Sequence, residues 1–410
     1  MGIQGERGSK SSLSGRMKRI VNCVVVLGIM TLVLQVTPYA QKFLRLGEPL
    51  PGVSPVEFER FRLGLDDFLE VETPEEGLGP AYNGRSCAEC HSIPVVGGIA
   101  PVTTVRAGRR LFNGQFEDFD PRRGSLFQLF SIPTHGCQSV IPSEANVIAR
   151  RVPIPLFGAG LVEAIPDETL LALQDPEDRD RDGISGRAAV VIDRGSGESR
   201  IGRFGWKAQV ATLLEFGADA YRNEMGITND LFMEELTYNL SEAQLLDCDP
   251  IQEPEDIPEL GTGLRGIDNF EAFMKFLAPL PRGPITAEVL AGREVFDAVG
   301  CSACHVPTLM TGSNPNPLFD RKSVQLFSDL LLHDIGSGDG IRQAAGGPEE
   351  IRTPALWGLR FRRPLLHDGS AATIADALLR HEGEAQPTIQ RLRNVSSQAK
   401  TDLLAFLESL

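Results

Sequence analysis

The chain has 410 residues, of which 42% are hydrophobic and 23% charged, and a formal net charge of -15. This length allows two or three domains with sizeable cores, and the acidic balance argues against nucleic-acid binding, which needs a basic surface. The 42 glycines and 28 prolines predict a high proportion of loop.

The first 40 residues have the pattern of an export signal or an N-terminal anchor. Basic residues at 7–19 precede a mostly apolar run at 20–36. That run is long for the core of a signal peptide and short for a membrane-spanning helix. We favour a cleaved signal peptide over a retained anchor. Both place the folded part in the periplasm or otherwise outside the cytoplasm, with membrane attachment only through an uncleaved segment.

The five-residue pattern C-x-x-C-H occurs twice, at 87–91 and at 301–305. Two thiols one helical turn apart can bond to the two vinyl groups of one porphyrin, and the following histidine then lies under the iron. The alternative is structural zinc, which usually takes its four ligands from two separated pairs. The sequence therefore predicts two covalently bound haem c groups. The attaching cysteines and proximal histidines are Cys87, Cys90 and His91 in the first copy and Cys301, Cys304 and His305 in the second.

Two cysteines remain outside these motifs and the export segment, Cys137 and Cys248. An oxidising compartment favours a disulfide bond between them. The alternative is two unconnected buried thiols.

Each haem motif follows an apparent helix that contains G-x-x-x-F, at 64–68 and at 292–296. A helix followed by the haem-binding turn is the opening of a cytochrome c module. We therefore predict a mainly α fold of two cytochrome c-like haem domains, with a long, partly β insertion in the N-terminal half. The N-terminal haem domain with its insertion spans 41–278, after the signal or anchor at 1–40, and the C-terminal domain spans 285–410.

Apolar periodicity and turn residues predict the individual elements. In chain order they are a helix at 58–68, hairpin strands at 188–193 and 201–204, a helix at 207–224, a proline-rich linker at 277–284, and helices at 286–299, 373–380 and 397–410.

The second axial ligand decides what each iron does, because an iron with two protein ligands passes electrons and an iron with an open face binds a small molecule. His381 extends the apolar face of Ile374 and Leu378 and is the predicted second ligand of the C-terminal haem. A buried histidine bonded to a carbonyl is the alternative. Met225 is a candidate ligand in the N-terminal half, although a methionine at helical spacing is more often core.

Further residues are candidates for haem surroundings. His333 and His367 lie in turns and would order loops or haem propionates, and His135 would face a haem or lie at the surface. Trp206 would lie between the haems or pack in the core.

The acidic stretch D-R-D-R-D-G at 178–183 resembles the first half of a calcium loop, in which alternating carboxylates surround a hard cation. The twelfth position is Ala189 and not a glutamate, so an acidic turn without calcium is the alternative.

Several stretches resemble the di-haem oxidoreductases of peroxidase type, relatives of the bacterial di-haem cytochrome c peroxidases, and the resemblance covers most of the mature chain. They are G-P-A-Y-N-G-R-S at 79–86, F-G-W-K-A-Q at 204–209, M-G-I-T at 225–228, R-T-P-A-L-W-G-L at 352–359 and L-H-D-G at 366–369.

The resemblance implies that the C-terminal haem takes electrons from a small donor protein, a cytochrome or a cupredoxin. It also implies that the N-terminal haem binds peroxide and cleaves its O–O bond. In the relatives the distal ligand of the C-terminal haem is usually methionine, so His381 departs from them and implies a bis-histidine haem of lower potential.

An acid–base residue is expected near the peroxide site. Glu163, a carboxylate in an apolar stretch, is one candidate, and a surface acid is its alternative. Gln209 is a second candidate, which would orient peroxide by hydrogen bonds. The predicted function is an exported di-haem peroxidase-like oxidoreductase. The alternatives are a pure electron-transfer di-haem cytochrome and an oxygenase or cofactor-maturation enzyme that uses high-valent iron.

Overall fold

The computed structural model describes residues 1–2, 45–119, 124–133, 136–236, 240–249, 251 and 255–410. The predicted export segment and His135 lie outside the described residues. Within these ranges no helix combines the length and the apolar character needed to cross a membrane. Leu46–Leu410 form one compact unit, so the division into two haem domains stays a prediction.

The helices and strands are spread along this unit. The helices are α2 (Pro55–Leu69), α3 (Cys87–Cys90), α4 (Ala159–Glu163), α5 (Asp167–Leu173), α6 (Leu213–Ala220), the π-helical turn η2 (Tyr221–Met225), α7 (Glu242–Cys248), α8 (Gly266–Phe276), α9 (Ala287–Val299), α10 (Ile374–Leu379), α11 (Gln386–Asn394) and α12 (Ser397–Ser409), with short 3-10 turns η1 (Pro74–Glu76), η3 (Cys301–Ala303), η4 (Leu359–Phe361) and η5 (Gly383–Ala385). The strands are β1 (Ala81–Tyr82), β2 (Thr104–Arg110), β3 (Phe116–Glu117), β4 (Leu126–Phe127), β5 (Phe130–Ser131), β6 (Val147–Arg151), β7 (Ala189–Ile192), β8 (Ser199–Gly202), β9 (Leu309–Met310), β10 (Ser323–Val324), β11 (Leu332–His333) and β12 (Ile351–Arg352).

Helix predictions near the two haem motifs are confirmed, and the starts of these helices have a local cause. Ser54, Thr286, Thr373 and Ser396 precede α2, α9, α10 and α12, and each side chain accepts a hydrogen bond from a backbone N–H of the first turn. Such N-caps satisfy donors that have no partner inside the helix.

The predicted hairpin is confirmed as β7 and β8, but the helix predicted at 207–224 begins six residues late. Residues 207–212 form turns and not a helix. The backbone N–H of Phe204, just before them, donates to the carbonyl of Val210. Gly205 and Ala208 have positive φ angles of 77° and 49°, which a helix does not allow. Helix α6 therefore starts only after its N-cap, Thr212.

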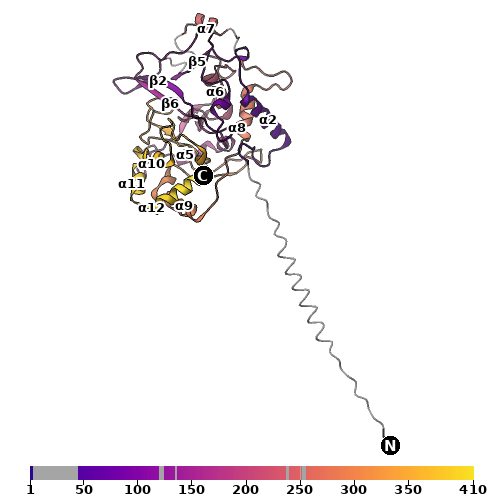
Figure 1. Ribbon diagram of the computed structural model, residues 1–410, viewed down its shortest axis with the longest axis vertical. Coiled ribbons are helices and arrows are strands. Elements are labelled where there is room, and N and C mark those ends of the chain that lie inside the picture. Colours follow the sequence, from indigo (N-terminus) through magenta and orange to yellow (C-terminus); the bar gives the residue numbers. More distant parts are fainter. Residues whose placement is uncertain (3–44, 120–123, 134–135, 237–239, 250, 252–254) are drawn as a thin grey trace. The chain divides into compact units, whose positions relative to one another are not determined.

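Two pairs of helices cross where the glycine of each G-x-x-x-F pattern lies. Helix α2 packs on α8, and α9 packs on α12 (Figure 1). A Cβ atom on Gly64 would overlap the carbonyl oxygen of Asn269, and one on Gly292 would overlap that of Asp402. Glycine is thus what lets the two backbones of each pair approach this closely.

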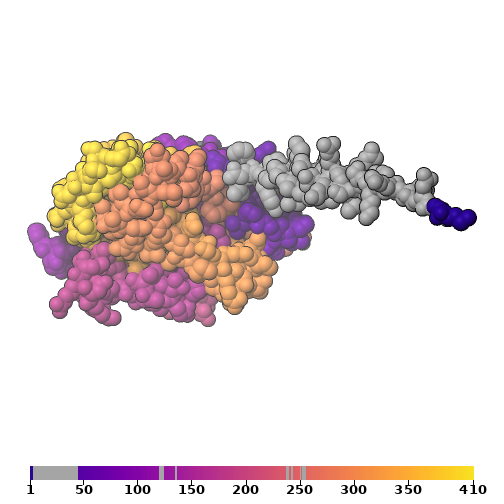
Figure 2. Space-filling model, turned by 90° about the horizontal axis from the view of Figure 1, so that it is seen from below, coloured from indigo at the N-terminus to yellow at the C-terminus, as the bar shows by residue number. Residues whose placement is uncertain are grey.

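The phenylalanine of each pattern packs against the same partner helix. The Phe68 and Phe273 ring centroids lie 4.8 Å apart, and those of Phe296 and Phe406 lie 5.2 Å apart. Figure 2 shows α12, in yellow, alongside orange segments of the C-terminal half. Each haem motif therefore follows a helix that is held in place by close packing on a partner helix.

The insertion, predicted to be partly β, contains an antiparallel sheet of β2, β3, β4 and β6, whose strands the sequence analysis did not predict individually. Strand β2 pairs with β6 along one edge and with β3 and β4 along the other. Thr104 lies opposite Arg151, and Arg106 lies two residues further along β2. Because side chains alternate along a strand, all three lie on one face of the sheet.

The proline-rich segment predicted as a linker is part of the core. Leu277 is fully buried, and Leu280 is 6% exposed. The hydrophobic cluster around them contains residues of both halves, including Phe157, Phe319 and Trp357. The halves of the chain share this core, so the segment joins them without separating them.

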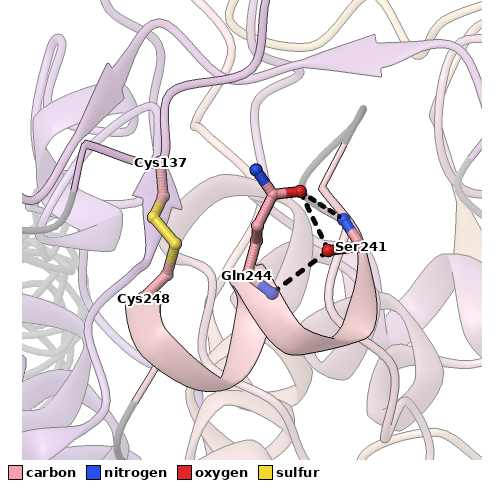
Figure 3. The surroundings of a disulfide bond; sticks show 4 residues. All are labelled: Cys137, Ser241, Gln244 and Cys248. Atoms are coloured by element: carbon pink, nitrogen blue, oxygen red, sulfur yellow. Dashed lines mark hydrogen bonds between the residues drawn. A yellow bond between two sulfur atoms is a disulfide. The ribbon is translucent and has the colours of Figure 1, made fainter.

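The predicted disulfide bond is confirmed. Cys137 and Cys248 are bonded, with their Cα atoms 6.0 Å apart, and both are buried (Figure 3). Cys248 ends α7, whose N-cap Ser241 exchanges hydrogen bonds with Gln244. The bond closes a loop of 111 residues and ties the insertion to the segment before α8.

We expect Gly292→Ala to destabilise the fold, because the new methyl group forces α9 away from the carbonyl of Asp402. Overpacking of this kind costs about 1–3 kcal/mol. Denaturant unfolding of the folded holoprotein measures it. The matched control is Glu294→Ala on the exposed face of α9, which should stay within about 0.5 kcal/mol of the wild type. Equal stability of the two variants would contradict a close helix crossing.

Candidate functional site

Two large cavities each contain one C-x-x-C-H motif. The first, with an empty volume of about 1130 Å³ including its open mouth, is lined by Cys87, Cys90 and His91. The second, of about 1260 Å³ on the same measure, is lined by Cys301, Cys304 and His305. None of these four cysteines is part of a disulfide bond. We call these the N-terminal cavity and the C-terminal cavity.

Each motif histidine is oriented in the same way. The ring Nδ1 of His91 donates to the carbonyl of Gly98 at 2.9 Å, and that of His305 donates to the carbonyl of Phe327 at 3.0 Å. Burial lowers the pKa of both imidazoles to about 4, so both rings are neutral. A neutral imidazole anchored through Nδ1 presents Nε2 to a metal, as iron ligation requires.

The C-terminal cavity holds a second anchored histidine. His381 follows α10 and lines this cavity, and its Nδ1 donates to the carbonyl of Ala377 at 2.7 Å. Burial lowers the pKa of His381 and keeps its ring neutral. His381 and His305 line the same cavity. His381 therefore presents a free Nε2 to the same cavity as His305.

His333 also lines the C-terminal cavity, but both of its ring nitrogens are occupied. They contact carboxylate oxygens of Asp329 and Glu384, each at 2.8 Å, and Nδ1 lies 3.7 Å from the sulfur of Cys304. Burial opposes protonation of the ring. These hydrogen bonds outweigh it and hold the pKa of His333 well above its usual range. His333 is therefore a charged residue in the cavity wall beside the haem motif. Because both of its ring nitrogens are occupied, it is not available as an axial ligand of iron.

Trp206 lines both cavities, and His367 lines the C-terminal one next to it. The indole N–H donates to the carbonyl of Val152 at 2.8 Å, and the indole and His367 rings meet edge to face at 6.2 Å. Trp206 is thus part of the wall of both cavities, and its predicted place between two haems stays a prediction.

The N-terminal cavity differs from the C-terminal one in its polar residues. Among the described residues that line it, His91 is the only histidine. Its lining includes Gln209 and Met225, which the sequence analysis named as candidate site residues, and also Glu224. The Glu224 carboxylate accepts a hydrogen bond from Asn83 at 2.7 Å. Burial raises its pKa above the usual range, against the opposing effects of Asn83 and Arg106.

Glu163 lies elsewhere. Its carboxylate accepts a hydrogen bond from the backbone N–H of Leu213 at 2.7 Å, at the start of α6. It is absent from the described lining of both cavities. Burial raises its pKa, as the sequence interpretation expected, but the group is placed to cap a helix. Glu224, one position before the candidate Met225, is half-buried and has the cavity position that was expected of Glu163.

Both cavities contain buried arginines that suit an anionic group. Arg106 and Arg151 line the N-terminal cavity, and their Nε and Nη2 atoms, respectively, are buried without a hydrogen-bond partner in the described part of the chain. Arg352 and Arg362 line the C-terminal cavity, where burial lowers the pKa of each to about 10. Buried cations require counter-charges, and haem propionates are carboxylates. The residues therefore fit a haem in each cavity.

The three aspartates of the predicted calcium loop lie close together. Ligand oxygens of Asp178, Asp180 and Asp182 lie within 4.8 Å of one another in a largely exposed loop. Calcium at this loop stays a prediction.

Residues 133–410 match the sequence family described as "Di-haem oxidoreductase, putative peroxidase". The chain belongs to this di-haem oxidoreductase family. It is therefore an oxidoreductase, and membership of a di-haem family implies haem c as its cofactor.

Known proteins similar to this di-haem oxidoreductase include the methylamine utilization protein MauG of Methylorubrum extorquens. It is 27% identical over 209 residues, which are 46% of this chain and 54% of MauG, so the chain spans about half the length of that relative. Solved structures with a similar chain trace include the diheme peroxidase BthA of Burkholderia thailandensis (TM-score 0.42, 15% identity, 89% of this chain and 87% of BthA covered) and a MauG-like protein associated with microbial copper homeostasis (TM-score 0.40, 17% identity, 89% and 92% covered).

We expect the mass of the mature holoprotein to exceed that of its polypeptide by two haem groups. Replacing Cys87 and Cys90 together with alanine should remove one of them, because both thioether bonds of that haem are lost. Intact-protein mass spectrometry after acid–acetone extraction counts the groups that remain. Replacing Cys137 and Cys248 with serine is the matched control and should leave both haems attached. A polypeptide mass without added haem would contradict covalent attachment.

Proposed function

We propose that this oxidoreductase reduces a peroxide at the N-terminal cavity, with electrons that enter through the C-terminal cavity. The observation that carries the proposal is the asymmetry of the cavities. A second anchored histidine, His381, faces the C-terminal motif, whereas the N-terminal cavity has acid, amide and thioether side chains in place of a second histidine among its described lining residues. A haem supplies the iron at which a peroxide O–O bond is cleaved or through which electrons pass.

In the N-terminal cavity the chain's own residues would bind and protonate the substrate. Glu224 would hold a proton, because burial raises the pKa of its carboxyl, and would deliver it to the leaving oxygen. Gln209 would orient the peroxide through its side-chain amide. Asn83 fixes the Glu224 carboxylate by a hydrogen bond of 2.7 Å, which limits its freedom to leave the cavity.

In the C-terminal cavity, His305 and His381 would hold the iron from both faces and so exclude substrate. Held by both histidines, the haem would supply electron transfer at this cavity. We propose a small donor protein, a cytochrome or a cupredoxin, as the source of these electrons. Trp206 would shorten the path between the two cavities, because it lines both.

We also propose that the protein works outside the cytoplasm. The disulfide bond between Cys137 and Cys248 supports this, because such bonds form and persist in oxidising compartments.

Met225 carries the second candidate function. Its side chain is 3% exposed and lines the N-terminal cavity. If its sulfur closed the N-terminal iron, both haems would be six-coordinate and the protein would only transfer electrons. Combined optical and electron paramagnetic resonance titration with hydrogen peroxide separates the two functions. A peroxidase gives a high-spin signal that peroxide abolishes, whereas an electron-transfer protein gives two low-spin signals that peroxide leaves unchanged.

Glu224→Gln should slow the reaction of the holoprotein with hydrogen peroxide, because the amide cannot donate a carboxyl proton. Loss of a general acid typically costs about 10²–10⁴-fold in rate. Stopped-flow absorbance of the haem bands measures the rate. Glu163→Gln is the matched control, since it alters a half-buried carboxyl group outside the described cavity linings and should react at the wild-type rate. Equal effects of the two substitutions would assign no acid–base role to Glu224.

His381→Ala should open one face of the C-terminal haem. The low-spin ferric signal of that haem should be replaced by a high-spin signal in the paramagnetic resonance spectrum, because a single axial histidine is a weak ligand field. His367→Ala, in the same cavity, is the control and should keep the low-spin signal. An unchanged spectrum of the His381 variant would show that another group completes the coordination.

A further inference from the structure

A buried tyrosine and a buried glutamate form a pair that the proposed function does not use. The hydroxyl of Tyr221 donates to Oε1 of Glu72 at 2.7 Å. Tyr221 is 8% exposed and Glu72 is 7% exposed. The bond joins residues 149 positions apart, so the fold brings them together.

Both partners are fixed to the wall of the N-terminal cavity. The backbone N–H of Glu72 donates to the carbonyl of Arg85, two residues before Cys87. Tyr221 begins η2, and the cavity residues Glu224 and Met225 lie in the same turn.

Aromatic packing brings Tyr221 close to the same cavity. Its ring meets that of Phe270, a cavity residue, edge to face with centroids 4.9 Å apart. Burial raises the pKa of the Cys87 thiol, and the negative charge of Glu72 raises it further. The pair therefore lies next to residues that line the N-terminal cavity.

This environment favours coupled loss of an electron and a proton. A phenol oxidised in an apolar interior must release its proton, because a buried phenol cation is costly. Burial and the adjacent Glu72 raise the pKa of Tyr221 well above its usual range, so the phenol does not ionise by itself. Burial raises the pKa of Glu72 to about 7, so near neutral pH a large share of this carboxyl group is ionised and can accept a proton.

We propose that Tyr221 is a one-electron redox site of this protein, with Glu72 as its proton acceptor. The proposal rests on the proposed function, since peroxide is the oxidant. The phenol gives one electron to the peroxide-oxidised N-terminal haem, its O–H bond breaks, and the proton passes to Oε1 of Glu72. The products are a neutral phenoxyl radical, a neutral carboxylic acid and a haem group reduced by one electron. An oxidising equivalent is thereby held in the protein, apart from the iron.

Rapid-freeze paramagnetic resonance of the holoprotein mixed with hydrogen peroxide tests the proposal. We expect a tyrosyl radical in the wild type and none in Tyr221→Phe, which retains the ring packing on Phe270. Tyr82→Phe is the matched control, because Tyr82 is half-buried and packs on Phe130 with ring centroids 5.9 Å apart. The control should keep the radical. Its presence in the Tyr221 variant, or its absence from the wild type, would overturn the proposal.

Optical spectra of the same samples separate this inference from the proposed function. Haem bands that respond to peroxide without a tyrosyl signal would remove the Tyr221 site and leave the peroxidase function intact. Haem bands that do not respond would remove both. In Tyr221→Phe the radical should be lost while the haem bands still respond to peroxide. If Tyr221 had only a structural role, its replacement would change the radical and the haem bands together.

Glu72→Gln tests the proton acceptor. The amide oxygen still accepts a hydrogen bond from the phenol but cannot take its proton, so radical formation should slow by about a hundredfold. In the wild type the radical yield should rise between about pH 6 and pH 8, as Glu72 ionises, and in the variant it should not. Glu70, Glu76, Asp256 and Tyr221 are the groups that act on Glu72. Equal rates and pH profiles in both proteins would exclude Glu72 as the acceptor.

Discussion

Close contact between helix backbones at two glycines is the constraint on which the rest of the structure depends. At Gly64 and at Gly292 a side chain would overlap a carbonyl oxygen of the partner helix. The next turn of each helix places Phe68 or Phe296 on the partner, and the haem motif follows. Each motif histidine is then held by a carbonyl from a separate loop. Only a few packed residues separate each helix crossing from the motif histidine that follows it. A change in the spacing of the helices would therefore shift that histidine, and the two crossings thus position both candidate iron sites.

The cavities also contain charges that the protein fold alone does not compensate fully. Arg362 is 8% exposed and donates to the carbonyl of Ala355, which carries only a partial charge. Arg151 has an ion pair with Asp339 but retains a buried nitrogen without a partner in the described chain. Burying such groups is unfavourable unless an anion completes the site. We infer that the polypeptide is most stable with its cofactors in place, as expected for proteins in which ligand binding contributes to folding.

Local signals predicted the two haem motifs, the capped helices beside them and the disulfide bond, because each depends on a few neighbouring residues or on a count of cysteines. The cavity surroundings depend on distant pairings. Arg106 and Arg151 reach one face only because β2 and β6 pair in a particular register. Glu224 lies in a π-helical turn held to Asn83 and Gly84, and sequence periodicity does not encode that contact. The Glu163 interpretation used an apolar neighbourhood correctly but had no means to tell a helix cap from a cavity wall.

The segment from Phe204 to Lys207 connects the two cavities physically. Trp206 lines both, and its carbonyl accepts a hydrogen bond from the backbone of Arg352, a residue of the C-terminal cavity. The side chain of Arg352 also donates to the carbonyl of Gly205. On the other side, Lys207 and Arg151 share the carboxylate of Asp339. Arg352 of the C-terminal cavity therefore holds the backbone of this segment, whereas Arg151 of the N-terminal cavity is linked only to the Lys207 side chain, through Asp339. Hydrogen bonds and ion pairs thus join residues of the two cavities through one short segment of chain.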